Sequence, residues 1–162
     1  KGAVWSARLC SEALLAATGG GDFTAILWDA VTGQEKATLP HKHIVKTVSF
    51  APDRARLATG GHEGLLRVYE LARPDNPAVS LAHADAAGAK VKLLHADWLS
   101  DALLVSGAED GHVRVFGVDD EEREARNVVT DIEGKRGRAR LKDFAVLFRA
   151  AVQAPCASVL QM

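Results

Sequence analysis

The strongest constraint on this chain is a glycine-led segment that occurs three times. The segments TGGGDFTAILW, TGGHEGLLRVY and SGAEDGHVRVF align without gaps and begin at residues 18, 59 and 106. Each begins with Thr or Ser followed by Gly, carries an acidic residue at its fifth position, and ends in an apolar residue followed by an aromatic one. The starting points are 41 and 47 residues apart. Repetition at such a period indicates an array in which each repeat is one supersecondary unit.

The glycine run at residues 19–21 is interpreted as a turn rather than a phosphate-binding loop. A phosphate loop of the Walker type needs Gly-Lys followed by Ser or Thr at the start of a helix. Here Asp22 follows, and its carboxylate would repel a phosphate. A strand-like pattern comes next, so the dinucleotide-binding fingerprint fails as well.

The segments between these landmarks repeat too. Residues 41–53, HKHIVKTVSFAPD, read as an apolar strand followed by a Pro-Asp turn, and residues 2–9 and 92–98 match them. His83 and Trp98 are 15 residues apart, against 9 for His41 and Phe50, so the third unit contains an inserted loop. The pattern predicts four strands in each unit. The predicted strands lie near 3–9, 14–18, 24–28, 35–39, 44–50, 56–60, 65–70, 78–82, 91–98, 102–106, 112–116 and 126–132.

Composition favours an ordinary globular chain with proteins as its partners. The 162 residues leave room for one domain and a tail, and the formal net charge of -1 calls for neither nucleic acid nor an anionic membrane. Cys10 and Cys156 form no paired motif, which suits a reducing compartment. No apolar run reaches the length of about 18 residues that spans a bilayer. We therefore expect a cytoplasmic location, allow a nuclear one, and expect no membrane insertion.

The last part of the sequence, residues 119–162, carries none of the repeated landmarks. It opens with the acidic cluster DDEERE, followed by the basic run KRGRARLK at 135–142. Apolar residues between 139 and 152 fall at helical spacing, which is compatible with an amphipathic helix. The basic run could bind RNA weakly or act as a nuclear signal, whereas a solvated segment or out-of-family sequence is the simpler alternative.

The repeated glycine turn and the Trp-Asp pair at 28–29 resemble the landmarks of WD-repeat proteins. That resemblance implies an all-β fold of about three four-stranded antiparallel propeller blades. Residues 1–118 would form the propeller segment, with units at about 1–40, 41–82 and 83–118. A propeller typically needs at least four blades to close. We therefore expect an incomplete propeller that is a piece of a longer protein or that closes by self-association.

In WD-repeat blades a His before the first strand, a Ser or Thr on the second, an acidic residue in the next turn and a Trp on the third form a buried polar chain. The resemblance places these roles, unit by unit, on Thr18, Asp22 and Trp28; on His41, Thr59, Glu63 and Tyr69; and on His83, Ser106 and Asp110. Phe116 occupies the Trp position of the third unit but has no donor, so we expect this unit to be the least stable. Since the histidines then have structural uses, we expect no metal, no cofactor and no small-molecule substrate.

The segments KGAVW, DFTAILWDAVTG and HKHIVKTVSF resemble those of the unrip, or serine-threonine kinase receptor-associated, family of WD-repeat proteins. The resemblance is strong over residues 1–71 and weaker to about 118. It implies a scaffold without enzymatic activity that binds other proteins, in the survival-motor-neuron complex of spliceosomal RNA-protein assembly or in growth-factor signalling. The i-subunit family of the third translation initiation factor is the alternative. Trp5 and Lys46, near the mouth of a propeller channel, are candidate partner contacts, although Trp5 could instead pack between blades.

Overall fold

The structure, a computed structural model, describes residues 2–85, 87–118, 127 and 128. These residues form twelve strands in three four-stranded sheets, and none of them lies in a helix. Within each sheet the strands pair antiparallel in chain order. The all-β prediction of three four-stranded units that do not close a ring is confirmed.

The strands lie within one or two residues of their predicted positions for most of the chain. The first sheet consists of β1 (Val4–Cys10), β2 (Leu15–Gly20), β3 (Thr24–Asp29) and β4 (Glu35–Pro40). The second consists of β5 (Val45–Phe50), β6 (Arg56–Gly61), β7 (Leu65–Glu70) and β8 (Val79–Ala82). The third consists of β9 (Leu93–Trp98), β10 (Leu103–Ala108), β11 (Val113–Gly117) and β12 (Asn127–Val128).

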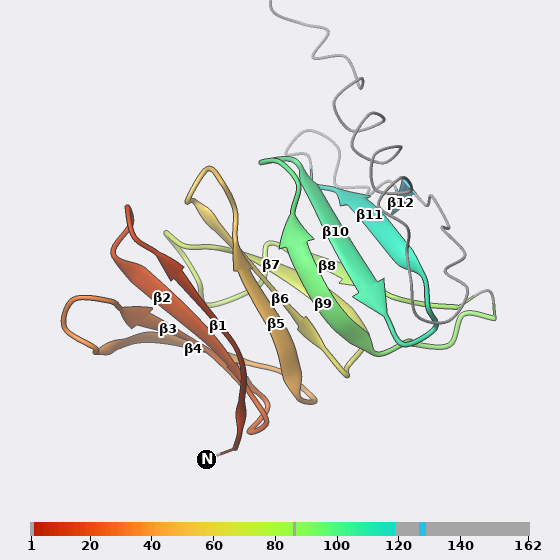
Figure 1. The fold of residues 1–162 in the computed structure, drawn as a ribbon, viewed down its shortest axis with the longest axis horizontal. Helices are drawn as coiled ribbons and strands as arrows, with labels where there is room; N and C mark the ends of the chain where they lie inside the picture. Colours follow the sequence, from red (N-terminus) through yellow and green to blue (C-terminus); the bar gives the residue numbers. More distant parts are fainter. Residues whose placement is uncertain (1, 86, 119–126, 129–162) are drawn as a thin grey trace, which may run out of the picture.

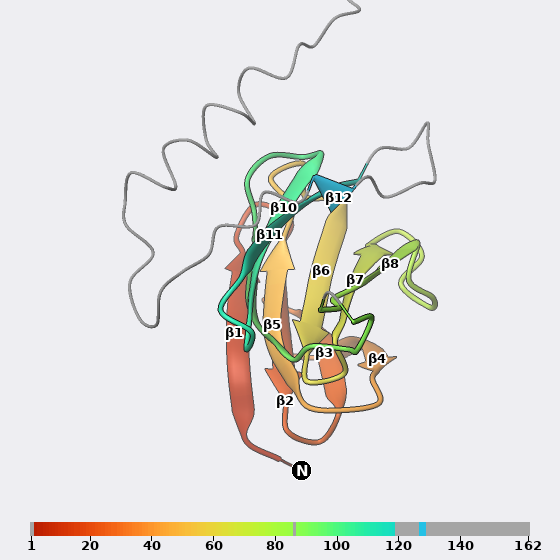
Figure 2. The ribbon, with the colours of Figure 1, turned by 90° about the vertical axis from the view of Figure 1, so that its right-hand side faces the viewer.

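The three sheets follow one another in space as they do in sequence (Figure 1). Their first strands, β1, β5 and β9, are neighbours, and in the perpendicular view of Figure 2 β1 and β5 lie toward one side while β4 and β8 lie toward the other. This is the arrangement of propeller blades, in which the first strand of each blade lies nearest the axis.

Two apolar layers hold the sheets together. Side chains alternate along each strand, so that β3 buries Ala25 and Leu27 while Thr24 and Ile26 stay partly exposed. The buried side chains of the first sheet meet those of the second, and the second sheet packs against the third through its other face. The first layer contains Ala17, Ala25, Leu27, Leu39, Val45, Val48, Leu57 and Tyr69; the second contains Leu66, Val68, Leu81, Leu93, Trp98, Leu104 and Phe116.

Hydrogen bonds between neighbouring first strands fix how the sheets are aligned. The Val48 N–H donates to the Ser6 hydroxyl over 3.2 Å. One blade further, the Thr47 hydroxyl donates to the Ala96 carbonyl over 3.0 Å. Because both partners of the second bond are buried, losing one would leave a polar group without water or protein to satisfy it.

The repeated glycines are needed at close approaches, both between neighbouring sheets and between strands of one sheet. A Cβ on Gly19 would lie 2.8 Å from a methyl carbon of Val45 in the next sheet. A Cβ on Gly61 would lie 2.0 Å from the Ile44 carbonyl oxygen, closer than any real contact. The glycine run therefore permits close packing as well as the turn expected for it.

The fourth strand expected near 126–132 is present as β12, which pairs with β11 through Val115–Val128 and Phe116–Asn127. The helix expected over 139–152 and the basic run lie outside the described residues.

Candidate interaction surface and the polar chains behind it

A β-bulge recurs at the same place in all three blades. The first strand of each sheet pairs with the second except at one residue, where the register shifts. The residues left out of the pairing are Trp5, Lys46 and Leu94. A bulge bends its strand and redirects a side chain. Trp5 is 51% exposed and Leu94 is 48% exposed, so two of these three positions present apolar side chains to solvent.

Trp5 and Lys46, the two candidate partner contacts, lie against each other. The Lys46 ammonium nitrogen is 3.2 Å from the centre of the Trp5 ring. A cation over an aromatic face is attracted by the ring quadrupole, by about 0.5–1 kcal/mol at an exposed site. Because this contact joins β1 to β5, the pair forms a preassembled aromatic and cationic feature at the junction of two blades.

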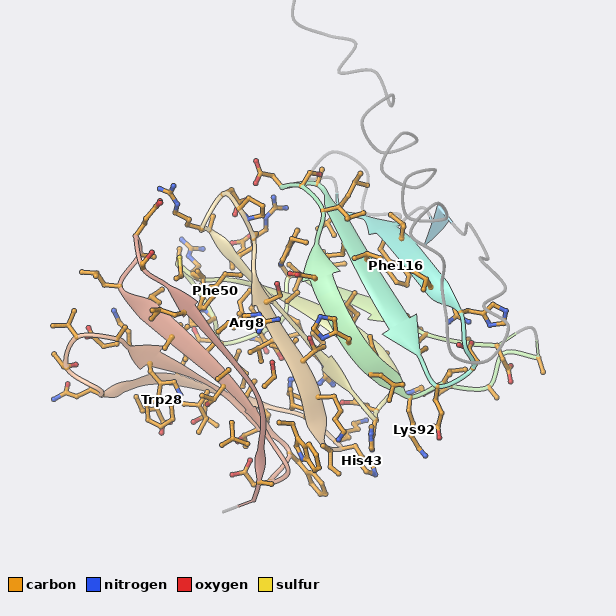
Figure 3. The ribbon with its side chains drawn as sticks, in the orientation of Figure 1. Arg8, Trp28, His43, Phe50, Lys92 and Phe116 are labelled. Atoms are coloured by element: carbon orange, nitrogen blue, oxygen red, sulfur yellow. The ribbon has the colours of Figure 1, made fainter. Side chains whose placement is uncertain are left out.

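A second row of rings extends from this end of the molecule. Phe23 lies 5.4 Å from His43, and His43 lies 5.4 Å from His62, measured between ring centres. The rings come from the β2–β3 turn, the β4–β5 loop and the β6–β7 turn. In Figure 3 His43 and Lys92 lie at the same end of the structure.

Phe23 holds an uncommon backbone conformation in its turn. Its φ is 68°, in the left-handed region, and the aligned residues Gly64 and Gly111 have φ of 73° and 83°. A non-glycine residue pays about 1–2 kcal/mol in this region. The first blade thus has the 45% exposed ring of Phe23 at a position where the other two blades have glycine.

Behind this surface the middle blade contains a continuous polar chain. The His41 ring Nε2 lies 3.1 Å from the Thr59 hydroxyl. Its Nδ1 lies 2.5 Å from the Arg67 guanidinium and 3.8 Å from a Glu63 oxygen. Glu63 also accepts hydrogen bonds from Arg67 at 2.7 Å and from the Lys42 N–H at 3.0 Å. Three predicted members of this unit are thus brought together, and Arg67 joins them.

The presence of Arg67 sets the direction of the hydrogen bonds. A guanidinium only donates, so His41 Nδ1 accepts from Arg67 and Nε2 carries the ring proton. Nε2 then donates to the Thr59 hydroxyl oxygen, whose own proton is left for the Tyr69 oxygen. Burial raises the pKa of Tyr69, and its hydrogen bond with Thr59 acts in the opposite direction. A Trp at position 69 could only donate, and so could not take that proton.

In the first blade the hydrogen bond between the hydroxyl and the aromatic residue of the third strand has the opposite direction. The Trp28 indole N–H donates to the Thr18 hydroxyl over 2.9 Å. The residue aligned with Arg67 is Ile26, so no guanidinium enters this chain. Asp22 is exposed and accepts a hydrogen bond from the Thr24 hydroxyl.

The third blade has a shorter chain. The Ser106 hydroxyl lies 2.8 Å from His83 Nε2, and within the described part of the molecule His83 Nδ1 has no hydrogen-bond partner. Asp110 binds Arg114 at 2.5 Å rather than His83. The Phe116 ring lies 5.0 Å from the His83 ring (Figure 3 labels Phe116 on β11), so an aromatic contact replaces the absent donor.

Sequence reasoning missed the two arginines. Arg67 and Arg114 occupy the same aligned position, two residues before the aromatic of each segment, and each binds the acidic residue of its own turn. The signal was present in the alignment, where ILW in the first unit becomes RVY and RVF in the others. Among these three segments, the one that ends in Trp has no arginine at this position, and the two with arginine end in Tyr or Phe.

The polar chains keep both buried histidines neutral. Burial, and then the nearby Arg67, lowers the pKa of His41 to about 4. Burial and Arg114 lower the pKa of His83 to about 4. Burial acts to raise the pKa of Asp110, but hydrogen bonds from Arg114 and the His112 N–H outweigh it and hold the pKa at about 2.

The two buried histidines of the described residues, His41 and His83, are thus part of the packing between strands. No three His, Cys, Asp or Glu side chains among residues 2–85, 87–118, 127 and 128 are grouped so that they could hold a metal ion. Across the same ranges no helix has the length and apolarity to span a bilayer. What the described surface presents is a set of exposed aromatic and cationic side chains at one end of three blades.

Comparison with known proteins agrees with this geometry. The WD domain, G-beta repeat, family profile matches residues 33–70. The β-propeller domain of Myceliophteria thermophila Cps50 (Swd1) superposes with a TM-score of 0.65 at 12% identity, over 77% of this chain and 38% of that one. The WD40 repeats of RRP9 superpose with a TM-score of 0.64 at 17% identity, over 73% and 36% of the two chains. The described residues thus form three blades with the fold of WD-repeat β-propellers.

Within that class the chain resembles serine-threonine kinase receptor-associated protein. It is 47% identical to the Gallus gallus protein and 46% identical to the Homo sapiens protein, in each case over 117 residues, or 72% of this chain. Eukaryotic translation initiation factor 3 subunit I of Lodderomyces elongisporus is 30% identical over 129 residues, which cover 72% of this chain and 36% of that protein. The match covers 32% of the receptor-associated proteins, so the chain spans about a third of their length.

Proposed function

We propose that this chain provides part of a non-catalytic WD-repeat scaffold that binds other proteins. The observation that carries the proposal is the recurrent bulge, which places Trp5, Lys46 and Leu94 at equivalent positions of consecutive blades, with Trp5 and Leu94 exposed and Lys46 half-buried. Exposed aromatic side chains are enriched in protein interfaces, where they supply much of the binding energy. Likeness to serine-threonine kinase receptor-associated proteins supports the same reading.

In the cell the scaffold would serve spliceosomal RNA-protein assembly with the survival-motor-neuron complex, or growth-factor receptor signalling. Its place would be the cytoplasm, and the nucleus where assembly requires it. A role in a translation initiation complex is the second candidate. The observation behind it is the 30% identity to the initiation-factor subunit.

Affinity purification of the tagged chain tests the proposal. Recovery of survival-motor-neuron components or receptor kinases supports the first role, and recovery of initiation-factor subunits supports the second. The control is the tagged Trp5→Ala/Lys46→Ala variant, which should lose its partners if the bulge positions make the contact. A chain that recovers no partner in any of these preparations contradicts the scaffold role.

A further inference from the structure

One surface at the end of the first two blades combines aromatic and cationic side chains. It consists of Trp5, Phe23, His43, Lys46 and His62, and we call it the basic–aromatic surface. Its members contact one another in two sets, Trp5 with Lys46 and Phe23 with His43 and His62. The His62 N–H donates to the Ile44 carbonyl over 3.0 Å, two residues before Lys46, so the two sets lie on neighbouring segments.

Positive charge gathers at this end of the structure. Of the five lysines among the described residues, four lie on its loops and strand ends: Lys42, Lys46, Lys90 and Lys92. Most carboxylates nearby are already engaged: Glu63 with Arg67, Asp110 with Arg114 and Glu109 with Lys92. Asp22 and Asp85 remain exposed there, with hydrogen bonds from hydroxyl or backbone groups.

The opposite end is built differently. There most cations are paired with carboxylates: Arg54 with Glu12, Arg56 with Asp53 and Lys36 with Asp29, while Arg73 is in none of the ion pairs of the described residues. Lys42, Lys46 and Lys90 are in none of the ion pairs of the described residues, whereas the opposite end carries carboxylates outside these pairs, Glu70, Asp75 and Asp101, so the two ends differ in net charge. Charge complementarity directs an anionic partner to the basic–aromatic surface.

Resting on the proposed function, we infer that the basic–aromatic surface binds an acidic linear segment of a partner protein, with its carboxylates on Lys46, His43 and His62 and an apolar side chain against Trp5 or Phe23. The exposed rings supply the apolar contact that a purely electrostatic site lacks. Nucleic acid fits less well, because backbone binding requires many phosphate contacts and the whole chain carries a net charge of -1.

Binding of such a segment should strengthen as the pH falls. Burial and the neighbouring Lys46, His43 and Lys92 lower the pKa of His62, while Glu109 acts to raise it. An incoming carboxylate favours the charged imidazolium and would raise that pKa. Binding then takes up a proton, so affinity increases at lower pH.

Fluorescence anisotropy with the full chain provides the test. The probes are a short labelled peptide rich in Glu with one Leu, its Lys-for-Glu counterpart, and a labelled oligouridine of similar length. The Glu peptide should bind, more tightly at about pH 6 than at about pH 7.5, and the Lys peptide should not. Lys46→Glu should weaken binding about tenfold, and the matched Lys36→Glu at the other end should change it by less than about twofold.

Phe23→Gly provides a second variant that keeps the turn, because Gly64 and Gly111 hold the same conformation in the sister blades. It should weaken peptide binding about threefold through loss of the ring. The inference is overturned if the Glu peptide does not bind, if Lys36→Glu weakens binding as much as Lys46→Glu, or if oligouridine binds more tightly than the peptide. If the Lys46→Glu chain fails to bind the Glu peptide but still recovers its partner proteins in the purification, those partners do not use the basic–aromatic surface. That result would overturn the inference and leave the scaffold role standing.

Discussion

The middle and third blades bury the same histidine–hydroxyl pair and complete it in different ways. His41 uses both ring nitrogens, one toward Thr59 and the other toward Arg67. His83 uses one, toward Ser106, and packs its ring against Phe116. One arginine position serves both blades, but only in the middle blade does the guanidinium reach the imidazole. The difference shows that a repeat can keep its fold while its polar chain is shortened, provided that an apolar contact fills the space.

Lowering the pH should produce the largest loss of unfolding free energy, and it should destabilise both blades. The folded pKa of about 4 for each histidine lies below the ordinary 6.5, so the unfolded chain binds more protons between these values. Stability is then fully present above pH 6.5 and is lost as the pH falls toward 4, by about 3 kcal/mol for each histidine. Denaturant titrations across this range measure the loss.

The variants His41→Asn and His83→Asn separate the two contributions. Each should flatten the pH dependence of the unfolding free energy by about half. An unchanged slope in both variants would show that the histidines are not the titrating groups. Loss of stability below pH 3.8 belongs to a separate window, in which Asp110, with its pKa of about 2, gains its proton on unfolding.

Gly61→Ala should be the most destabilising single substitution of this group, at about 3 kcal/mol. The new Cβ would meet backbone atoms of Ile44 and Lys46, which cannot move without breaking the β5–β6 pairing. The third blade already has Ala108 at the aligned position. Gly107→Ala, where a Cβ meets nothing within 4 Å, is the control and should change the unfolding free energy by less than about 1 kcal/mol.

Removing the hydroxyl partner should cost more in the third blade than in the middle one. Ser106→Ala would leave the ring of the fully buried His83 without the one hydrogen bond it makes among the described residues, at about 2–3 kcal/mol. Thr59→Val would leave His41 with Arg67 and Glu63, at about 1–2 kcal/mol. Equal losses in urea unfolding would mean that Arg67 does not compensate.

A double-mutant cycle should give the smallest effect and tests the exclusion of Trp by Arg. While Arg67 fixes the His41 ring, the Thr59 hydroxyl donates its proton toward position 69. Tyr69→Trp then places a second donor, the indole N–H, against that hydroxyl. Combining it with Arg67→Ile reproduces the arrangement of the first blade, so the pair should couple favourably by about 1 kcal/mol. Coupling near zero would show that the direction of the hydrogen bonds does not decide which aromatic is accepted.

The repeat, the strands and the class of fold follow from local patterns in the sequence. Thr18, Thr59 and Ser106 start identical patterns, and alternation along each strand decides which side chains are buried, because a strand has a side-chain period of two. These are local properties, and they can be counted along the chain. The same local pattern singled out Trp5 and Lys46 as equivalent positions.

The contacts that those residues make depend on how the sheets pack against one another. The register shift that frees Trp5, Lys46 and Leu94 depends on pairing between strands, and the contact between Trp5 and Lys46 depends on packing between blades. Arg67 enters the histidine chain because strand β7 and the β4–β5 loop meet in space, although Arg67 and His41 are 26 residues apart along the chain. Hydrogen bonds and ring contacts act over a few ångströms, so their partners are set by the packing of the sheets, which a single repeat does not contain.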